Sequence, residues 1–288
     1  MYLFSLFFLL LISCTNIVGN GSDTRTQSTP LSAADKLAIE AHKAMADSIV
    51  ESAFAFRNRD KLRPVHVNVK LRQDFIQENE AESESGNPLL DTLLQEMGFI
   101  PQQKSASESQ GEFQGNNVAG YYISGSDSIV LILNNPQDTL TSQNKMTIFH
   151  EAIHAMQDQY HDLLDLTADI TTFDEAFAYR AAVEGEAHLM ESLLAISLRE
   201  VKDSITIDSL QRFFLSQVET VEQQTQNLYQ ESKVPIFTSL PTYLSYTQGA
   251  WYHTNKMDSI FDFKSIESTY ANMPQNTYQI LGGEEGYS

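Results

Sequence analysis

Residues 147–159 have the sequence TIFHEAIHAMQDQ, which contains the pattern HExxH and decides how the chain is interpreted. His150 and His154 are four positions apart, and positions i and i+4 lie on one face of an α-helix, so both imidazoles can bind one small ion. Glu151 projects beside them. This stretch therefore predicts a metal-binding helix. Three apolar side chains give that helix a face for core packing: Phe149, Ile153 and Met156.

Zinc suits two histidines in this arrangement, because it accepts nitrogen ligands without demanding a particular geometry. Three protein ligands leave a fourth position for water, and the ion lowers the pKa of that water. Glu151 can then take the proton of the water as it attacks a polarised carbonyl group. We therefore expect one Zn²⁺ per chain, with His150 and His154 as two of its ligands and Glu151 as the catalytic base.

A second helical pattern downstream contains the sequence AAVEGEAHL. Its tetrapeptide EGEA, residues 184–187, resembles the glutamate-glycine-x-alanine signature in which many gluzincin metallopeptidases place their third zinc ligand. The resemblance implies that Glu184 is this ligand, with Glu186 as the competing candidate. A metzincin is disfavoured, because that class needs a glycine and a histidine at the positions of Gln157 and Tyr160.

The similarity extends to a loosely defined group of bacterial gluzincin-like proteins that are often secreted or lipid-anchored. It implies a zincin-like, gluzincin-type fold and a peptide or protein substrate. The chain departs from the group's pattern at Tyr278 and at Gly282–Gly283, where the group has glutamate and a histidine-proline pair, so the sequence leaves open whether activity is retained. Five segments carry the resemblance: Met97–Phe99, Tyr121–Tyr122, residues 150–159, residues 184–187 and Pro274–Thr277.

Three further polar residues are candidates for supporting roles. Asp158 follows His154 by four positions and could orient an imidazole through its free N–H; a solvated acid is the alternative. Tyr246 and His253 could donate hydrogen bonds to a developing oxyanion, as transition-state donors; core packing is the alternative for both.

The N-terminus indicates export and lipid anchoring. Residues 1–13, MYLFSLFFLLLIS, are almost purely apolar but too short for a transmembrane helix, and they end at Cys14, the only cysteine of the chain. Leu11–Cys14 resembles the lipobox of bacterial lipoproteins, which implies cleavage before Cys14 and lipidation of that residue. The alternative is a plain signal peptide with a coincidental cysteine. Residues 14–30 are then the lipidated cysteine and a flexible tether.

Thr15 bears on the membrane to which such an anchor would hold the protein. It is not the aspartate that commonly retains lipoproteins in the inner membrane. We therefore expect a location in the cell envelope, on the outer membrane facing the periplasm or at the cell surface. The formal net charge of −20, from 38 acidic and 18 basic side chains, argues against nucleic acid as a partner, because phosphate contacts need lysine or arginine.

Residues 31–288 are expected to form one zincin-like metallohydrolase domain of helix-dominated α+β class. The segment GYYISGSDSIVLIL, residues 120–133, predicts an edge hairpin before the HExxH helix, and Thr141 is a candidate cap for that helix. Loops are predicted at residues 78–87 and 101–117. The remaining expected elements are helices at 32–59, 88–98, 142–162, 172–200, 206–231, 247–258 and 263–271, and a strand at 64–71. In the first helix Ser32 is a candidate cap, and the expected apolar face consists of Leu37, Met45, Ile49, Ala53 and Phe56.

Two hypotheses from different classes follow from these patterns. In the first, the protein is a membrane-anchored zinc metallohydrolase that cleaves peptide bonds with Glu151 as the base. In the second, it is a catalytically inactive or structural-zinc lipoprotein that acts as a binding or scaffold module. Zinc content separates both from a chance occurrence of HExxH. A blocked fourth coordination position or a buried Glu151 would favour the second hypothesis, and the effect of replacing Glu151 tests the first.

Overall fold

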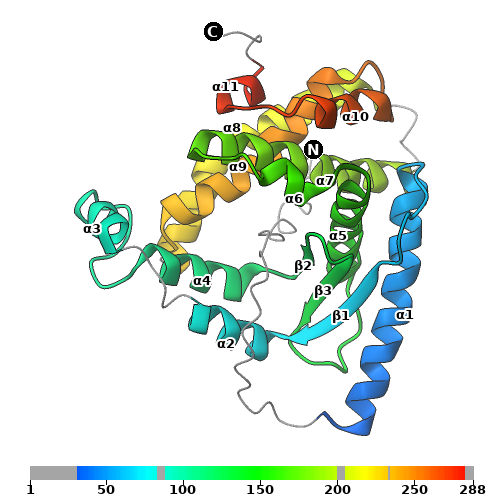
Figure 1. Cartoon of the computed structure of the whole chain (residues 1–288), viewed down its shortest axis with the longest axis horizontal. Helices are drawn as coiled ribbons and strands as arrows, with labels where there is room; N and C mark the ends of the chain where they lie inside the picture. The colour runs from blue at the N-terminus through cyan, green and yellow to red at the C-terminus, as the bar shows by residue number, and fades with distance from the viewer. Residues whose placement is uncertain (1–30, 83–87, 200–204, 233, 283–288) are drawn as a thin grey trace. The chain divides into compact units, whose positions relative to one another are not determined.

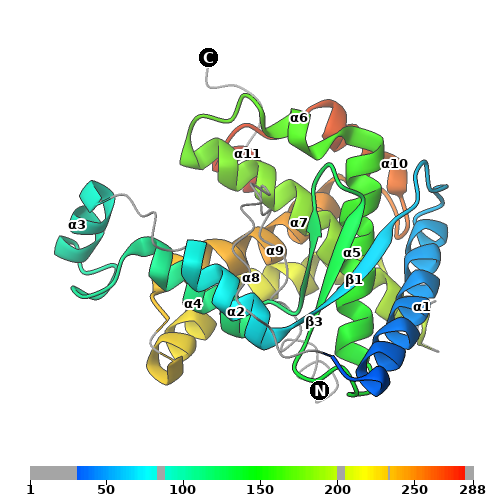
Figure 2. The same ribbon diagram turned by 60° about the horizontal axis from the view of Figure 1, so that its bottom comes forward.

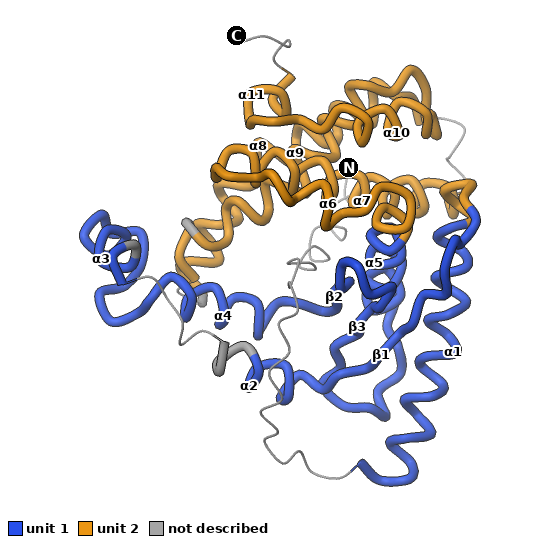
Figure 3. Tube along the Cα trace, in the orientation of Figure 1, with its two compact units in different colours: residues 1–54, 60–155 blue, residues 55–59, 156–288 orange. Residues whose placement is uncertain are grey.

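The computed structural model describes residues 31–82, 88–199, 205–232 and 234–282 (Figure 1). The chain divides into two compact units (Figure 3): unit 1 comprises residues 1–54 and 60–155, and unit 2 comprises residues 55–59 and 156–288. Helices dominate the described residues, which also contain a small three-stranded sheet. The predicted helix-dominated α+β class is therefore confirmed.

The described helices include none with both the length and the apolar composition needed to cross a bilayer. The predicted signal peptide (1–13), Cys14 and the tether up to residue 30 lie outside the described residues.

Unit 1 is a sheet with helices around it. Strand β3 is central, pairing in parallel with β1 and antiparallel with β2. Helix α5 begins in unit 1 and ends in unit 2. The elements in chain order are α1 (Ala33–Phe56), β1 (His66–Leu71), α2 (Arg72–Glu82), α3 (Pro88–Glu96), α4 (Ala106–Asn117), β2 (Gly120–Ile123), β3 (Ser128–Leu133) and α5 (Ser142–His161).

The central strand β3 is apolar on both of its faces. Residues 129–133 are all buried, which fits a strand that is covered from both sides. Val130 and Ile132 join a cluster with residues of α2, β2 and the end of α4, whereas α1 and α5 lie on the other side of the sheet (Figure 2). The hairpin from β2 to β3 turns through Gly125 and Asp127, both at positive φ (76° and 50°), as the sequence predicted.

Helix α5 is fixed at its start and against the sheet. The Thr141 hydroxyl accepts a hydrogen bond from the Asn144 N–H (3.1 Å) and Asn144 Oδ1 accepts one from the Thr141 N–H (3.0 Å), so the predicted cap is confirmed. A Cβ on Gly120 of β2 would lie 2.9 Å from Thr147 Cγ2. Because Gly120 has no side chain, α5 can approach the sheet closely one turn before His150.

Two predicted loops are wrong. Residues 106–117 form helix α4, which a capping box begins: the Ser105 hydroxyl accepts from the Glu108 N–H, and the Glu108 carboxylate accepts from the Ser105 N–H. Phe113 anchors this otherwise polar helix at 2% exposure. Residues 78–82, predicted as part of a charged loop, continue helix α2. Low apolar content suggested loops, but a local cap and one buried aromatic side chain suffice for a helix.

Helix α1 begins after Ser32, whose hydroxyl caps it as predicted, but its buried face is not the predicted one. Leu37 and Met45 are 75% and 42% exposed. His42 Nε2 instead donates to the Pro136 carbonyl (2.8 Å) within unit 1. Small side chains on this face let the helix pack closely. The buried residues of α1 are His42, Ala46, Val50, Ala53 and Phe54.

Unit 2 consists of helices. The described residues of α9 begin eleven positions before the predicted helix, and Pro241 lies inside it. Proline interrupts one helical hydrogen bond, but the packing of α9 on both α7 and α8 offsets this loss. The elements are α6 (Leu163–Thr167), α7 (Phe173–Ser197), α8 (Ile207–Ser232), α9 (Ile236–Lys256), α10 (Phe263–Ala271) and α11 (Thr277–Ile280).

Helices α7 and α9 meet backbone to backbone at two glycines. A Cβ on Gly249 would lie 1.8 Å from the Ala181 carbonyl oxygen, and a Cβ on Gly185 would lie 2.1 Å from the carbonyl carbon of Gly249. Neither position can carry a side chain without parting the helices. The glycine of the EGEA tetrapeptide is thus a packing residue, and it holds the flanking glutamates at a fixed place beside α9.

Candidate metal centre

The two histidines of HExxH face each other in unit 1. His150 Nε2 and His154 Nε2 are 3.1 Å apart, and the ring centroids are 4.8 Å apart at an interplanar angle of 78°. The residues are 1% and 4% exposed. Two nitrogens bound to one zinc at about 2.0–2.1 Å with a tetrahedral angle are roughly 3.3 Å apart. The observed separation is within about 0.2 Å of this value, so the pair is compatible with a shared zinc ion.

Glu151 lies between the histidines in sequence and is fully buried (0% exposed). Its position follows from the same cap and sheet contact that place His150, because His150, Glu151 and His154 all belong to helix α5. Full burial of this carboxylate is the feature that the binding or scaffold hypothesis predicts, so the effect of replacing Glu151 decides between the two hypotheses.

Glu184 is buried on α7 in unit 2 (5% exposed), and the Arg180 guanidinium one turn earlier lies 3.9 Å from its carboxylate. Among the described residues, His150, His154 and Glu184 form a buried group that could hold a metal ion. Two imidazoles and one carboxylate are a donor set compatible with zinc. The sequence thus identified all three members of this group.

Glu186, the competing candidate for the third ligand, is committed elsewhere in unit 2. Its carboxylate accepts from Arg57 Nε (2.9 Å), from the Tyr270 hydroxyl (2.5 Å) and from Gln157 Nε2 (3.0 Å). Burial alone would raise the pKa of Glu186, but the positive charge of Arg57 and these hydrogen bonds lower it overall. Glu186 is therefore an ionised structural residue.

Gln157 joins the end of the HExxH helix to the glutamate helix inside unit 2. Besides its bond to Glu186, its amide donates to the Val183 carbonyl at 2.9 Å, one residue before Glu184. Gln157 is fully buried and lies three positions after His154 on the same helix. In the sequence, Gln157 served only to exclude a metzincin. The HExxHxxQ spacing, one helical turn, was the signal that could have shown it.

Asp158 and the two candidate transition-state donors have structural contacts in unit 2. Asp158 Oδ1 accepts from the Leu163 N–H (2.9 Å) at the turn after α5. His253 Nε2 donates to the Ala182 carbonyl (2.7 Å), and burial lowers the pKa of His253. Tyr246 is fully buried, and its ring makes a T-shaped contact with that of His188, with 6.3 Å between the centroids.

A second ion pair extends the Glu186 contacts towards the surface of unit 2. Arg57 Nη2 also lies 2.9 Å from Glu267 Oε1, and Arg59 Nη2 lies 2.7 Å from Glu267 Oε2. His161 Nε2 is 3.3 Å from Glu267 Oε2, and its ring stacks on Tyr270 at 4.0 Å. Nothing in the sequence indicated this network, because its members are spread over more than 200 positions.

Glu267 should make the stability of the protein depend on pH. Burial alone would raise its pKa, but hydrogen bonds from His161 and Arg59 and the charges of Arg57 and Arg59 lower it from 4.5 to about 2. Stability from this group is therefore present above pH 4.5 and is lost as the pH falls towards 2. Since the side chain is partly exposed, we expect a discounted contribution of about 1–2 kcal/mol.

Urea unfolding of the wild type and of Glu267→Gln measures this contribution. The variant should be less stable at pH 7, and the difference between the two proteins should shrink steadily from pH 4.5 to pH 3. A difference that stays constant over this range would show that the Glu267 carboxylate is not stabilised by its neighbours.

Comparison with protein-family models, with curated proteins and with solved structures finds no match for this chain. The functional assignment below therefore depends on the donor set and its geometry.

Proposed function

We propose that the protein is a zinc-dependent metallohydrolase that cleaves peptide bonds, with a zincin-like arrangement in which His150, His154 and Glu184 bind the ion and Glu151 is the general base. The observation that carries this proposal is the 3.1 Å separation of two buried imidazole nitrogens one helical turn apart. Zinc bound there would polarise a carbonyl group and acidify a water molecule. Glu151, on the same helix as the two histidines, would supply the general base.

Each residue of the proposed site has a defined role. Helix α5 keeps the two imidazoles in register, so little reorganisation is needed when they bind a ligand. Glu151 accepts the proton of the attacking water and passes it to the departing amine, so it acts first as a general base and then as a general acid. Gln157 and Gly185 hold the glutamate helix in its place within unit 2.

Zinc content tests the donor set directly. The wild-type protein, reloaded with zinc and dialysed, should contain about one zinc per chain by elemental analysis. His154→Ala and Glu184→Gln should each reduce the zinc content at least tenfold at the same free zinc concentration, because each removes one of three protein ligands.

Glu191→Gln is the matched control for Glu184→Gln. Glu191 is also a buried glutamate of α7, and its carboxylate lies 3.3 Å from His188 Nδ1. This variant should keep its zinc. Equal loss of zinc in both glutamine variants, or no zinc in the wild type, would overturn the proposed ligand set. The lipid anchor on Cys14 and the envelope location remain predictions from the sequence.

A further inference from the structure

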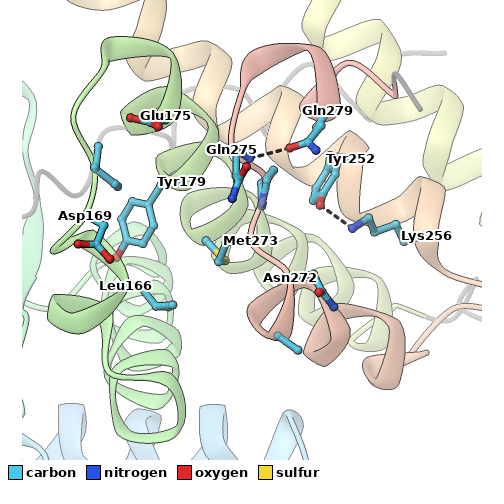
Figure 4. A pocket seen from close by; sticks show the side chains of 13 residues that line it. Leu166, Asp169, Glu175, Tyr179, Tyr252, Lys256, Asn272, Met273, Gln275 and Gln279 are labelled. Atoms are coloured by element: carbon cyan, nitrogen blue, oxygen red, sulfur yellow. Dashed lines mark hydrogen bonds between the residues drawn. The ribbon is translucent and has the colours of Figure 1, made fainter. Parts of the chain in front are cut away.

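Unit 2 contains a cavity of about 710 Å³ (Figure 4). Its wall is formed by α6 and the segment after it, the first turns of α7, the last turns of α9 and the connection between α10 and α11. Such a volume accommodates a ligand of a few residues. Many of the lining side chains are polar: Asp169, Glu175, Lys256, Asn272, Gln275 and Gln279.

Lys256 supplies the positive charge of this cavity. Its ammonium group donates to the Tyr252 hydroxyl at 2.5 Å and lies 4.3 Å from the centroid of the same ring, which orients it. No carboxylate among the described residues lies within 4.0 Å of it, although the chain has 38 acidic and 18 basic side chains. An oriented lysine without an acidic neighbour, at the wall of a cavity, suits an anionic group of a ligand.

The opposite side of the cavity is acidic, and amide side chains are also among the lining residues. Figure 4 shows Asp169 and Lys256 on opposite sides, with Gln275 between them. The Glu175 carboxylate is engaged by Thr171 and Thr172 at the start of α7, so Asp169 is the acidic group that remains. Primary amides both donate and accept hydrogen bonds, as the backbone of a peptide does.

We propose that this cavity binds a short peptide with free ends, its carboxylate at Lys256 and its amino group toward Asp169. A ligand with one charge at each end matches both sides, and the side-chain amides match its backbone. Tyr179 in the cavity wall belongs to α7, five residues or about 7.5 Å of helix rise before Glu184. The binding of such a peptide is independent of the proposed hydrolase activity. Its role as a substrate or product rests on that proposed function.

Calorimetric titration with tri-alanine and with its C-terminal amide tests the proposal. The titrations use the zinc-loaded Glu151→Gln protein, to prevent turnover, and are repeated after treatment with EDTA. Tri-alanine should bind about fivefold more tightly than the amide, and Lys256→Met should remove this difference while leaving the affinity for the amide unchanged. Asp169→Asn should weaken tri-alanine but not its N-acetyl form.

Lys264→Met is the matched control, because Lys264 is also an exposed lysine of unit 2 but does not line the cavity. It should bind both peptides as the wild type does. Equal affinity for tri-alanine and its amide, or an unchanged preference in Lys256→Met, would overturn the proposal. Peptide binding that persists after EDTA treatment would support the peptide site even if the zinc assay fails. A zinc-loaded protein that does not bind the peptide would refute the peptide site and leave the proposed zinc site intact.

Discussion

Replacing Glu151 with glutamine is expected to abolish peptide hydrolysis while the zinc content stays at about one per chain. Glutamine keeps the size of the side chain, and Glu151 is not among the three proposed ligands, so the donor set is undisturbed. An amide cannot accept a proton from water at neutral pH. The loss of a positioned general base costs about 10²–10⁴-fold in rate. The rate is measured on a mixture of quenched fluorescent peptides.

The control for this experiment is the zinc analysis of the same preparation, together with its circular dichroism. Undiminished hydrolysis by a folded, zinc-loaded Glu151→Gln protein would refute Glu151 as the base. A wild type that binds zinc but cleaves none of the peptides would favour the alternative of a binding or scaffold lipoprotein, in which the departures at Tyr278 and Gly282 mark a decayed enzyme.

Gly249→Ala is expected to destabilise the protein by about 3 kcal/mol, the upper end of the usual cost of overpacking. The new methyl group would lie 1.8 Å from the Ala181 carbonyl oxygen and 2.8 Å from Gly185 Cα. Both atoms belong to the backbone of a helix and cannot move aside as a side chain can. Alanine has a better helix propensity than glycine by about 1 kcal/mol, and this gain only partly offsets the clash. Urea unfolding at pH 7 measures the loss.

Gly115→Ala provides the matched control on helix α4. A Cβ there would lie 3.2 Å from Ile76 Cγ1, which is a side-chain atom that can shift by a few tenths of an ångström. The propensity gain should balance this adjustment, so the variant should be within about 1 kcal/mol of the wild type. If Gly249→Ala proves as stable as Gly115→Ala, then α7 and α9 are not in backbone contact at this point.

The sequence predicted the members of the candidate metal group better than their surroundings. His150, Glu151, His154 and Glu184 could be proposed because periodicity and a short signature place them at known helical offsets. The Arg57–Glu186 pair could not, since 129 positions separate its members and ordinary residues form it. Glu186 was consequently left as a rival ligand until its hydrogen-bond partners were seen.

Errors in the fold had local causes. Segment 101–117 has few apolar residues, and the prediction gave too little weight to the capping box of Ser105 and Glu108. Leu37 was assigned to the buried face of α1 because it is apolar, yet it is exposed, and the packed face is made of His42, Ala46, Val50, Ala53 and Phe54. Pro241 suggested a helix boundary that tertiary contacts with α7 and α8 override.

The tripeptide Glu184-Gly185-Glu186 carries three independent constraints in three adjacent positions. One residue belongs to the metal group, the next touches a neighbouring helix, and the third neutralises a buried arginine. Successive residues of a helix point about 100° apart, so these three residues face three different surroundings. No single substitution elsewhere can therefore remove all three constraints. In distant relatives, the equivalents of Gln157, of Glu184-Gly185-Glu186 and of Arg57 should therefore be kept together or lost together, even where the surrounding sequence has diverged.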